Sequence, residues 1–157
     1  MRGCKQQGAA AVEFALCLLP LLLIVPGIVD YGESWYIQSA LATASREGAR
    51  YATRYQTDST GARLIPSNLN PTIQDYVLNT PAQNGGSDKP GYGLLTLLPS
   101  NAVPTVTPGG AGLNTGTSGA VVSVTVSAQK YWLFLNRVMP GLSNPQTLAS
   151  TTTMSCE

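Results

Sequence analysis

The residues that could carry out chemistry in this chain are few and widely spaced. The sequence holds three cysteines, Cys4, Cys17 and Cys156, and no histidine. No two cysteines have the C-x-x-C spacing of a zinc site, so we expect no metal and no other cofactor. The missing histidine removes the usual general base of Ser–His and Cys–His catalysis. The carboxylates are scattered and no glycine-rich loop matches a phosphate-binding motif, so the sequence predicts no enzyme.

The overall charge is close to neutral. The chain has 157 residues and a formal net charge of +1, and only 11% of its residues are charged. This balance gives no basic surface for a nucleic acid, so we predict no nucleic-acid partner. Low charge combined with many Gly, Pro, Ser and Thr residues is typical of an envelope or extracellular protein.

One carboxylate, Glu13, stands inside an otherwise apolar segment. The run covers residues 9–29 and Glu13 lies five residues after Gly8. A charge in such a segment is costly and usually has a function. In the simpler interpretation the side chain lies about one turn inside a membrane and reaches the interface. In the other interpretation, the function of Glu13 depends on the five-residue spacing between Gly8 and Glu13.

Residues 9–29 are long enough to cross a bilayer as a helix, since about 1.5 Å per residue gives roughly 30 Å. Arg2 and Lys5 precede the run, whereas Asp30 and Glu33 follow it. The positive-inside rule therefore puts the N-terminus in the cytoplasm. A cleaved signal peptide would have a shorter apolar core, and Cys17 lies too deep in the run for a lipoprotein signal. We predict a single-pass anchor in the lipid bilayer.

The helical pattern continues beyond the span, over residues 30–55. Aromatic residues that would suit a membrane interface come first, at positions 31, 35 and 36. Residues at spacings of three and four then form one apolar face: Ile37, Leu41, Ala44, Gly48, Tyr51 and Tyr55. We expect this face to pack on the protein's own C-terminal domain. At other positions along the helix it would pack on other subunits. Arg46, Arg50 and Arg54 form a second stripe, which is either a solvated face or a docking surface for acidic groups of a partner.

Residues 56–157 are predicted to form a small domain outside the membrane. A short helix follows Asn70, which we expect to cap it, with Pro71 in its first turn. Prolines restrict the stretch before residue 109 to short extended pieces, and residues 109–120 are typical of a loop. Residues 120–132 and 146–157 each alternate with a period of two, which predicts two strands. A hairpin of these strands packed on the long N-terminal helix gives an α+β fold with a small antiparallel sheet.

The stretch GAAAVEF before an apolar helix resembles the processing site of type IV pilin-like precursors. Together with REGARYA further along, it resembles the TadE/TadG-like minor pilins, or pseudopilins, of the tight-adherence (Flp) type IVc pilus system. The resemblance covers about residues 7–55 strongly and 121–157 moderately. It implies a structural role in pilus assembly, initiation or capping, and so in adhesion.

The resemblance also implies specific residues and partners. A prepilin peptidase would cut between Gly8 and Ala9 and remove a basic leader, residues 1–8. Glu13, followed by Phe14, would pair with the new N-terminal amine of a neighbouring subunit and set the axial register. The implied partners are other pilin and pseudopilin subunits and the inner-membrane assembly platform. The chain would sit in a bacterial inner membrane with its C-terminal domain in the periplasm, or enter a surface pilus.

Two questions stay open at this point. The chain could instead be a membrane-anchored binding module of the envelope that is never polymerised. Cys156 would lie in an oxidising compartment without a partner in its own chain. It is either a free thiol or half of an intermolecular disulfide.

Overall fold

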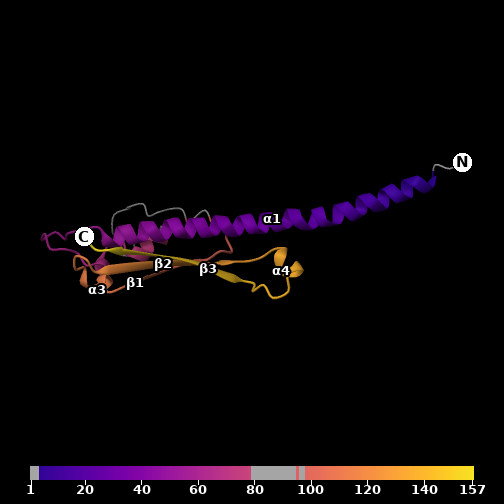
Figure 1. Cartoon of the computed structure of the whole chain (residues 1–157). Helices are drawn as coiled ribbons and strands as arrows, with labels where there is room; N and C mark the ends of the chain where they lie inside the picture. Colours follow the sequence, from indigo (N-terminus) through magenta and orange to yellow (C-terminus); the bar gives the residue numbers. More distant parts are fainter. Residues whose placement is uncertain (1–3, 79–94, 96–97) are drawn as a thin grey trace.

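The computed structural model describes residues 4–78, 95 and 98–157, and the side chains from residue 8 onward. It consists of one long helix and a small sheet domain that packs along the C-terminal half of that helix (Figure 1). The remaining half of the helix projects away from the domain. The predicted α+β fold is confirmed.

The long helix, α1, spans Cys4–Thr53 and is 50 residues long. It begins a few residues before the predicted start and ends two residues before Tyr55. Pro20 and Pro26 lie inside it, and the N-terminal part of the helix curves gently without a break (Figure 1). Each proline removes one backbone donor, which a membrane helix tolerates when local adjustments satisfy the freed carbonyl.

Three antiparallel strands form the sheet, in the order β1-β2-β3. The strands and the short helices between them follow α1 in this order: η1 Pro66–Asn68, α2 Ile73–Leu78, β1 Pro104–Gly109, α3 Gly112–Thr115, β2 Val121–Lys130, α4 Leu135–Val138 and β3 Gln146–Ser155. The hairpin of β2 and β3 is in register from Val121 opposite Ser155 to Lys130 opposite Gln146, as the alternating pattern predicts. β1 contains two prolines and is an edge strand, where a missing donor is tolerated.

Two local predictions were wrong. Asn70 does not cap α2 and Pro71 is not in its first turn, because α2 begins at Ile73 and Thr72 provides the cap. The Thr72 Oγ1 accepts the Asp75 N–H at 3.1 Å, as an N-cap side chain does, and its hydroxyl donates to the Asp75 carboxylate at 2.7 Å. The stretch 109–120 is not all loop, because it contains α3, which ends where Gly116 adopts a φ of 58°.

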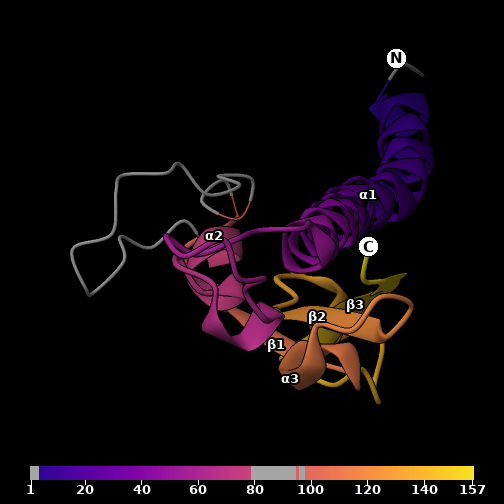
Figure 2. The same ribbon diagram turned by 90° about the vertical axis from the view of Figure 1, so that its left-hand side faces the viewer.

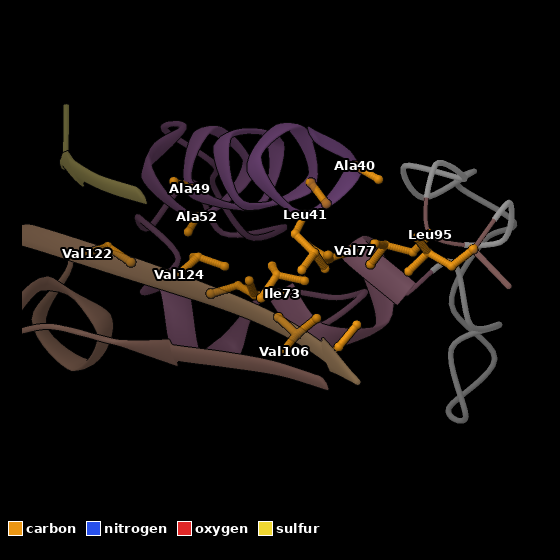
Figure 3. Packing of buried hydrophobic residues seen from close by; sticks show 14 of the residues in the cluster. Ala40, Leu41, Ala49, Ala52, Ile73, Val77, Leu95, Val106, Val122 and Val124 are labelled. Atoms are coloured by element: carbon orange, nitrogen blue, oxygen red, sulfur yellow. The ribbon is translucent and has the colours of Figure 1, made fainter. Parts of the chain in front are cut away.

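The core lies between one face of α1 and the sheet, with α2 closing one side (Figure 2). Valines of β2 meet small residues of α1 at the centre, and α2 adds Ile73 and Val77 (Figure 3). The predicted apolar face of α1 is buried at Ile37, Leu41, Ala44 and Gly48. Tyr51 is half-buried and stacks on Tyr76 with ring centroids 4.1 Å apart, whereas Tyr55 lies beyond the helix and is exposed.

A polar seam joins α1 to β3 beside this core. Ser45 is fully buried, and its Oγ lies 2.8 Å from the Thr152 Oγ1 and 3.3 Å from the Ser150 Oγ. The Gln38 side chain donates to the Ala149 carbonyl at 3.2 Å. Hydrogen-bonded contacts of this kind fix the position of β3 along the helix, because apolar surface alone does not select one register.

Gly48 of α1 packs closely against both α2 and the sheet. A Cβ at this position would lie 2.7 Å from a Val77 methyl carbon and 3.1 Å from a Val124 methyl carbon. We predict that Gly48→Leu overpacks the core and lowers the free energy of unfolding by about 1–3 kcal/mol or more. Urea unfolding of the full chain in detergent, followed by tryptophan fluorescence, measures this change.

Gly32→Leu is the matched control, because a Cβ at Gly32 on the same helix meets nothing within 4 Å. This control should be as stable as the wild type or slightly more stable, since leucine favours helix more than glycine does. Equal stability of the two leucine variants would contradict the proposed packing.

Candidate functional site along the N-terminal helix

The N-terminal part of α1, residues 8–29, has no protein cover in the described structure. Within the described residues, α1 is the one helix that is long and apolar enough to cross a membrane. Its most apolar window has a mean hydropathy of 2.5 and is 0% buried. Large side chains such as Phe14, Leu16 and Ile28 are 65–75% exposed. Uncovered apolar surface on this scale indicates a single-pass membrane anchor rather than the core helix of a globular domain.

The predicted processing and pairing residues all lie on this uncovered part. The Gly8–Ala9 bond lies near the start of α1, in its second turn, and a Cβ at Gly8 would meet nothing within 4 Å. Glu13 and Phe14 are exposed, and Glu13 makes no ion pair with the described part of the chain. An exposed carboxylate here is available to a group outside the chain. Cleavage after Gly8 and pairing by Glu13 stay predictions.

The three arginines of the second stripe are exposed along the sheet-covered part of α1. Arg50 pairs with Glu47 at 3.0 Å, a surface contact that contributes little to stability. Arg50 and Arg54 line an open hollow of about 650 Å³ together with Met154 and Glu157. Among the described residues Arg46 makes no ion pair. Docking of an acidic partner on this stripe stays a prediction.

Cys156 lies in the core, where 3% of its surface is exposed. Its backbone N–H donates to the Ala120 carbonyl at 2.8 Å, and its own carbonyl accepts the Gly119 N–H at 2.9 Å. These bonds hold the end of β3 against the turn before β2. The structure has Cys156 as a free thiol. An intermolecular disulfide stays a prediction, and it would require this end of the strand to open.

A buried charged cluster that was not predicted from the sequence joins α1 to the β2–β3 hairpin. We call Asp30, Glu33 and Lys130 the junction cluster. The Lys130 ammonium donates to the Glu33 carboxylate and lies 3.8 Å from the Asp30 Oδ1. The side chains of Lys130 and Asp30 are 1% and 2% exposed, and that of Glu33 is 27% exposed. The ammonium also lies 5.5 Å from the centre of the Trp132 ring.

Asp30 also fixes the start of α4. Its carboxylate accepts backbone N–H groups from Leu133 at 3.3 Å, Phe134 at 2.8 Å and Leu135 at 3.0 Å. Burial alone raises the pKa of Asp30, but these three donors and the nearby Lys130 outweigh it, and the net pKa lies below its ordinary value. A lowered folded-state pKa means that the carboxylate stabilises the fold above pH about 4 and loses this effect as the pH falls through the folded-state pKa.

One signal in the sequence did point to Lys130. The alternation that buries Val122, Val124 and Val126 continues through Ala128 to Lys130, so the lysine falls on the buried face of β2. A buried lysine needs an anionic partner. Asp30 and Glu33, spaced by three on α1, provide two. Only the fold brings these distant positions together.

Comparison with known proteins gives one family match. Residues 8–50 match the model of the family described as TadE-like protein. The match confirms the resemblance to the TadE-like family over these residues, which include the apolar part of α1, Glu13, the acidic residues of the junction cluster and most of the arginine stripe. No curated protein and no solved structure matches the chain.

The junction cluster generates a testable prediction. Asp30→Asn keeps the side-chain size but removes the charge, so Lys130 loses one anionic neighbour. In addition, one carboxylate oxygen that accepted backbone N–H groups is replaced by an NH₂ group, which can only donate. We expect the attachment of α4 to weaken by about 1–3 kcal/mol. Faster amide hydrogen exchange at residues 133–135 of the full chain in detergent would report the loss.

Asp58→Asn is the control. Asp58 also accepts backbone N–H groups, from Thr60 at 2.8 Å and Ala62 at 2.9 Å, but it lies on an exposed loop. Exchange at residues 133–135 should be unchanged in this variant. If Asp30→Asn also left that exchange at the wild-type rate, the cluster would not hold the hairpin.

Proposed function

We propose that this chain, which carries a TadE-like region over residues 8–50, is a membrane-anchored minor pilin of a tight-adherence pilus. It acts by assembly rather than by catalysis. The observation that carries the proposal is the family match over a helix whose apolar part projects, uncovered, from a small sheet domain. The helix would lie in the bacterial inner membrane with its N-terminus cytoplasmic and the sheet domain periplasmic.

The uncovered part of α1 suits two successive environments. In the membrane its apolar side chains contact lipid. In an assembly the same surface would contact the helices of other pilin and pseudopilin subunits. Small residues at positions 9–11, together with Gly27, let a neighbouring backbone approach closely. The inner-membrane assembly platform and a prepilin peptidase are the further partners that this role requires.

Glu13 would then provide axial register. Cleavage after Gly8 creates a free amine on Ala9, and the Glu13 carboxylate of an adjacent subunit neutralises it in apolar surroundings. Each charge is costly there without the other. The support for this assignment is that Glu13 is exposed and forms no ion pair within the described chain.

An alternative function is a membrane-anchored binding module that is never polymerised. The exposed hairpin and the arginine stripe would suit such a role. Fractionation separates the two, because a minor pilin appears at low amount in surface fibres sheared from cells, whereas a binding module stays entirely in the membrane fraction.

Processing is the first prediction of this proposal. Mass spectrometry of the protein from membranes should find Ala9 at the N-terminus. Gly8→Leu should block the cut, because a side chain hinders the extended backbone that a protease cleft requires. Gly32→Leu, on the same helix, should be cut normally. Retention of Met1 in the mature wild-type protein would contradict processing.

Incorporation into fibres is the second prediction. Glu13→Gln should lower the amount of the protein in sheared fibres by at least ~tenfold, because an unpaired buried charge costs about 3–5 kcal/mol. Immunoblots of sheared and membrane fractions measure it. Glu47→Gln, which changes an exposed ion pair on the same helix, should incorporate normally. Equal incorporation of Glu13→Gln and wild type would rule out the pairing.

A further inference from the structure

The tip of the β2–β3 hairpin, residues 131–145, exposes large apolar side chains. Leu133 is 77% exposed, Met139 is 51% exposed and Val138 is 46% exposed. Single exposed apolar residues are common on protein surfaces, but three within one short loop form a patch that needs a partner. The core does not use these residues.

The junction cluster fixes the height of this tip along α1. Asp30 directly follows the apolar run 9–29, and its carboxylate holds the backbone N–H groups of residues 133–135. Figure 1 shows α4 at the end of the sheet domain that is nearest the projecting part of α1. The tip therefore lies at the level where α1 would leave the bilayer.

Aromatic residues of α1 mark the same level. Tyr31 is 63% exposed and Trp35 is 72% exposed, and their ring centroids lie 6.4 Å apart. Exposed tyrosine and tryptophan just past an apolar span are typical of the membrane–water interface. The charges near the tip also favour a membrane. Residues 131–145 contain Arg137 and no acidic residue, so the loop itself is cationic, and the junction cluster behind it pairs its two carboxylates with the Lys130 ammonium.

We propose that the hairpin tip is a second membrane contact, through which Leu133, Val138 and Met139 enter the leaflet that α1 leaves. This inference rests on the membrane anchor of the proposed function. The partner is the lipid surface itself, because the patch continues the apolar surface of α1 at the height of the bilayer boundary. Arg137 is exposed and places its guanidinium among the lipid phosphates while its stem stays in apolar surroundings.

A nitroxide spin label on the full chain in vesicles of phosphatidylethanolamine and phosphatidylglycerol tests this contact. Labels go on single cysteines, at Leu133→Cys and Met139→Cys, in a background in which the native cysteines are replaced. Both side chains are exposed, so the label does not disturb the core. Collisions with oxygen, which concentrates in lipid, are compared with collisions with a water-soluble nickel chelate.

Two further labels calibrate the measurement. Leu22→Cys, at a position 60% exposed on the apolar part of α1, reports the anchor itself. Val121→Cys is the matched control for the tip, because Val121 is 48% exposed and stands at the other end of β2, about 30 Å away. We expect oxygen to dominate at positions 22, 133 and 139, and the nickel chelate to dominate at position 121.

The outcomes separate the two levels of inference. If the nickel chelate dominates at 133 and 139 while position 22 is in lipid, the second contact is wrong and the anchor stands. If it dominates at position 22 as well, the anchor and the proposed function fail together. Low collision with both reagents at 133 and 139 would mean that protein, such as a second copy, covers the tip, and this too would overturn the proposal.

Discussion

The uncovered apolar surface of the first part of α1 is the constraint on which the rest of the structure depends. One helix of 50 residues has to lie in apolar surroundings over its N-terminal part and in water over the remainder. The sheet domain covers only the second part, and it does so with small residues of α1 set against the valines of β2. A larger cover would shield the apolar surface that a membrane anchor requires. A smaller one would leave too little core for a domain of this size.

The junction cluster lies at the boundary between these two parts. Buried ion pairs seldom add much net stability, because removing both charges from water costs about as much as their attraction returns. Their better-attested use is to select one arrangement over others. Lys130 has two anionic neighbours on α1, and Asp30 accepts three backbone N–H groups and faces the Lys130 ammonium. The cluster thus fixes where the hairpin stands along the helix, whereas the apolar core provides most of the free energy of folding.

Periodicity made much of this fold predictable. The spacing of Ile37, Leu41, Ala44 and Gly48 identified the buried face of α1, and the alternation around Val124 identified β2. The cap of α2 was misassigned by two residues because Asn70 and Thr72 are both residue types that cap helices, and Thr72 is the one that accepts the Asp75 N–H. The junction cluster was missed because its members are brought together only by the fold. Glu13 could be singled out from its distance to Gly8 alone, since its proposed partner belongs to another subunit.

The close packing at Gly48 has a rotational consequence. An α-helix turns by about 100° per residue and resists twisting about its axis. Because Gly48 packs closely against Val77 and Val124, α1 has one rotational orientation about its own axis relative to the sheet. The rotational orientation that is fixed at Gly48 also applies at Glu13, which lies far from any contact with the sheet domain. The direction in which the sheet domain faces therefore also sets the side of α1 from which the exposed Glu13 carboxylate projects.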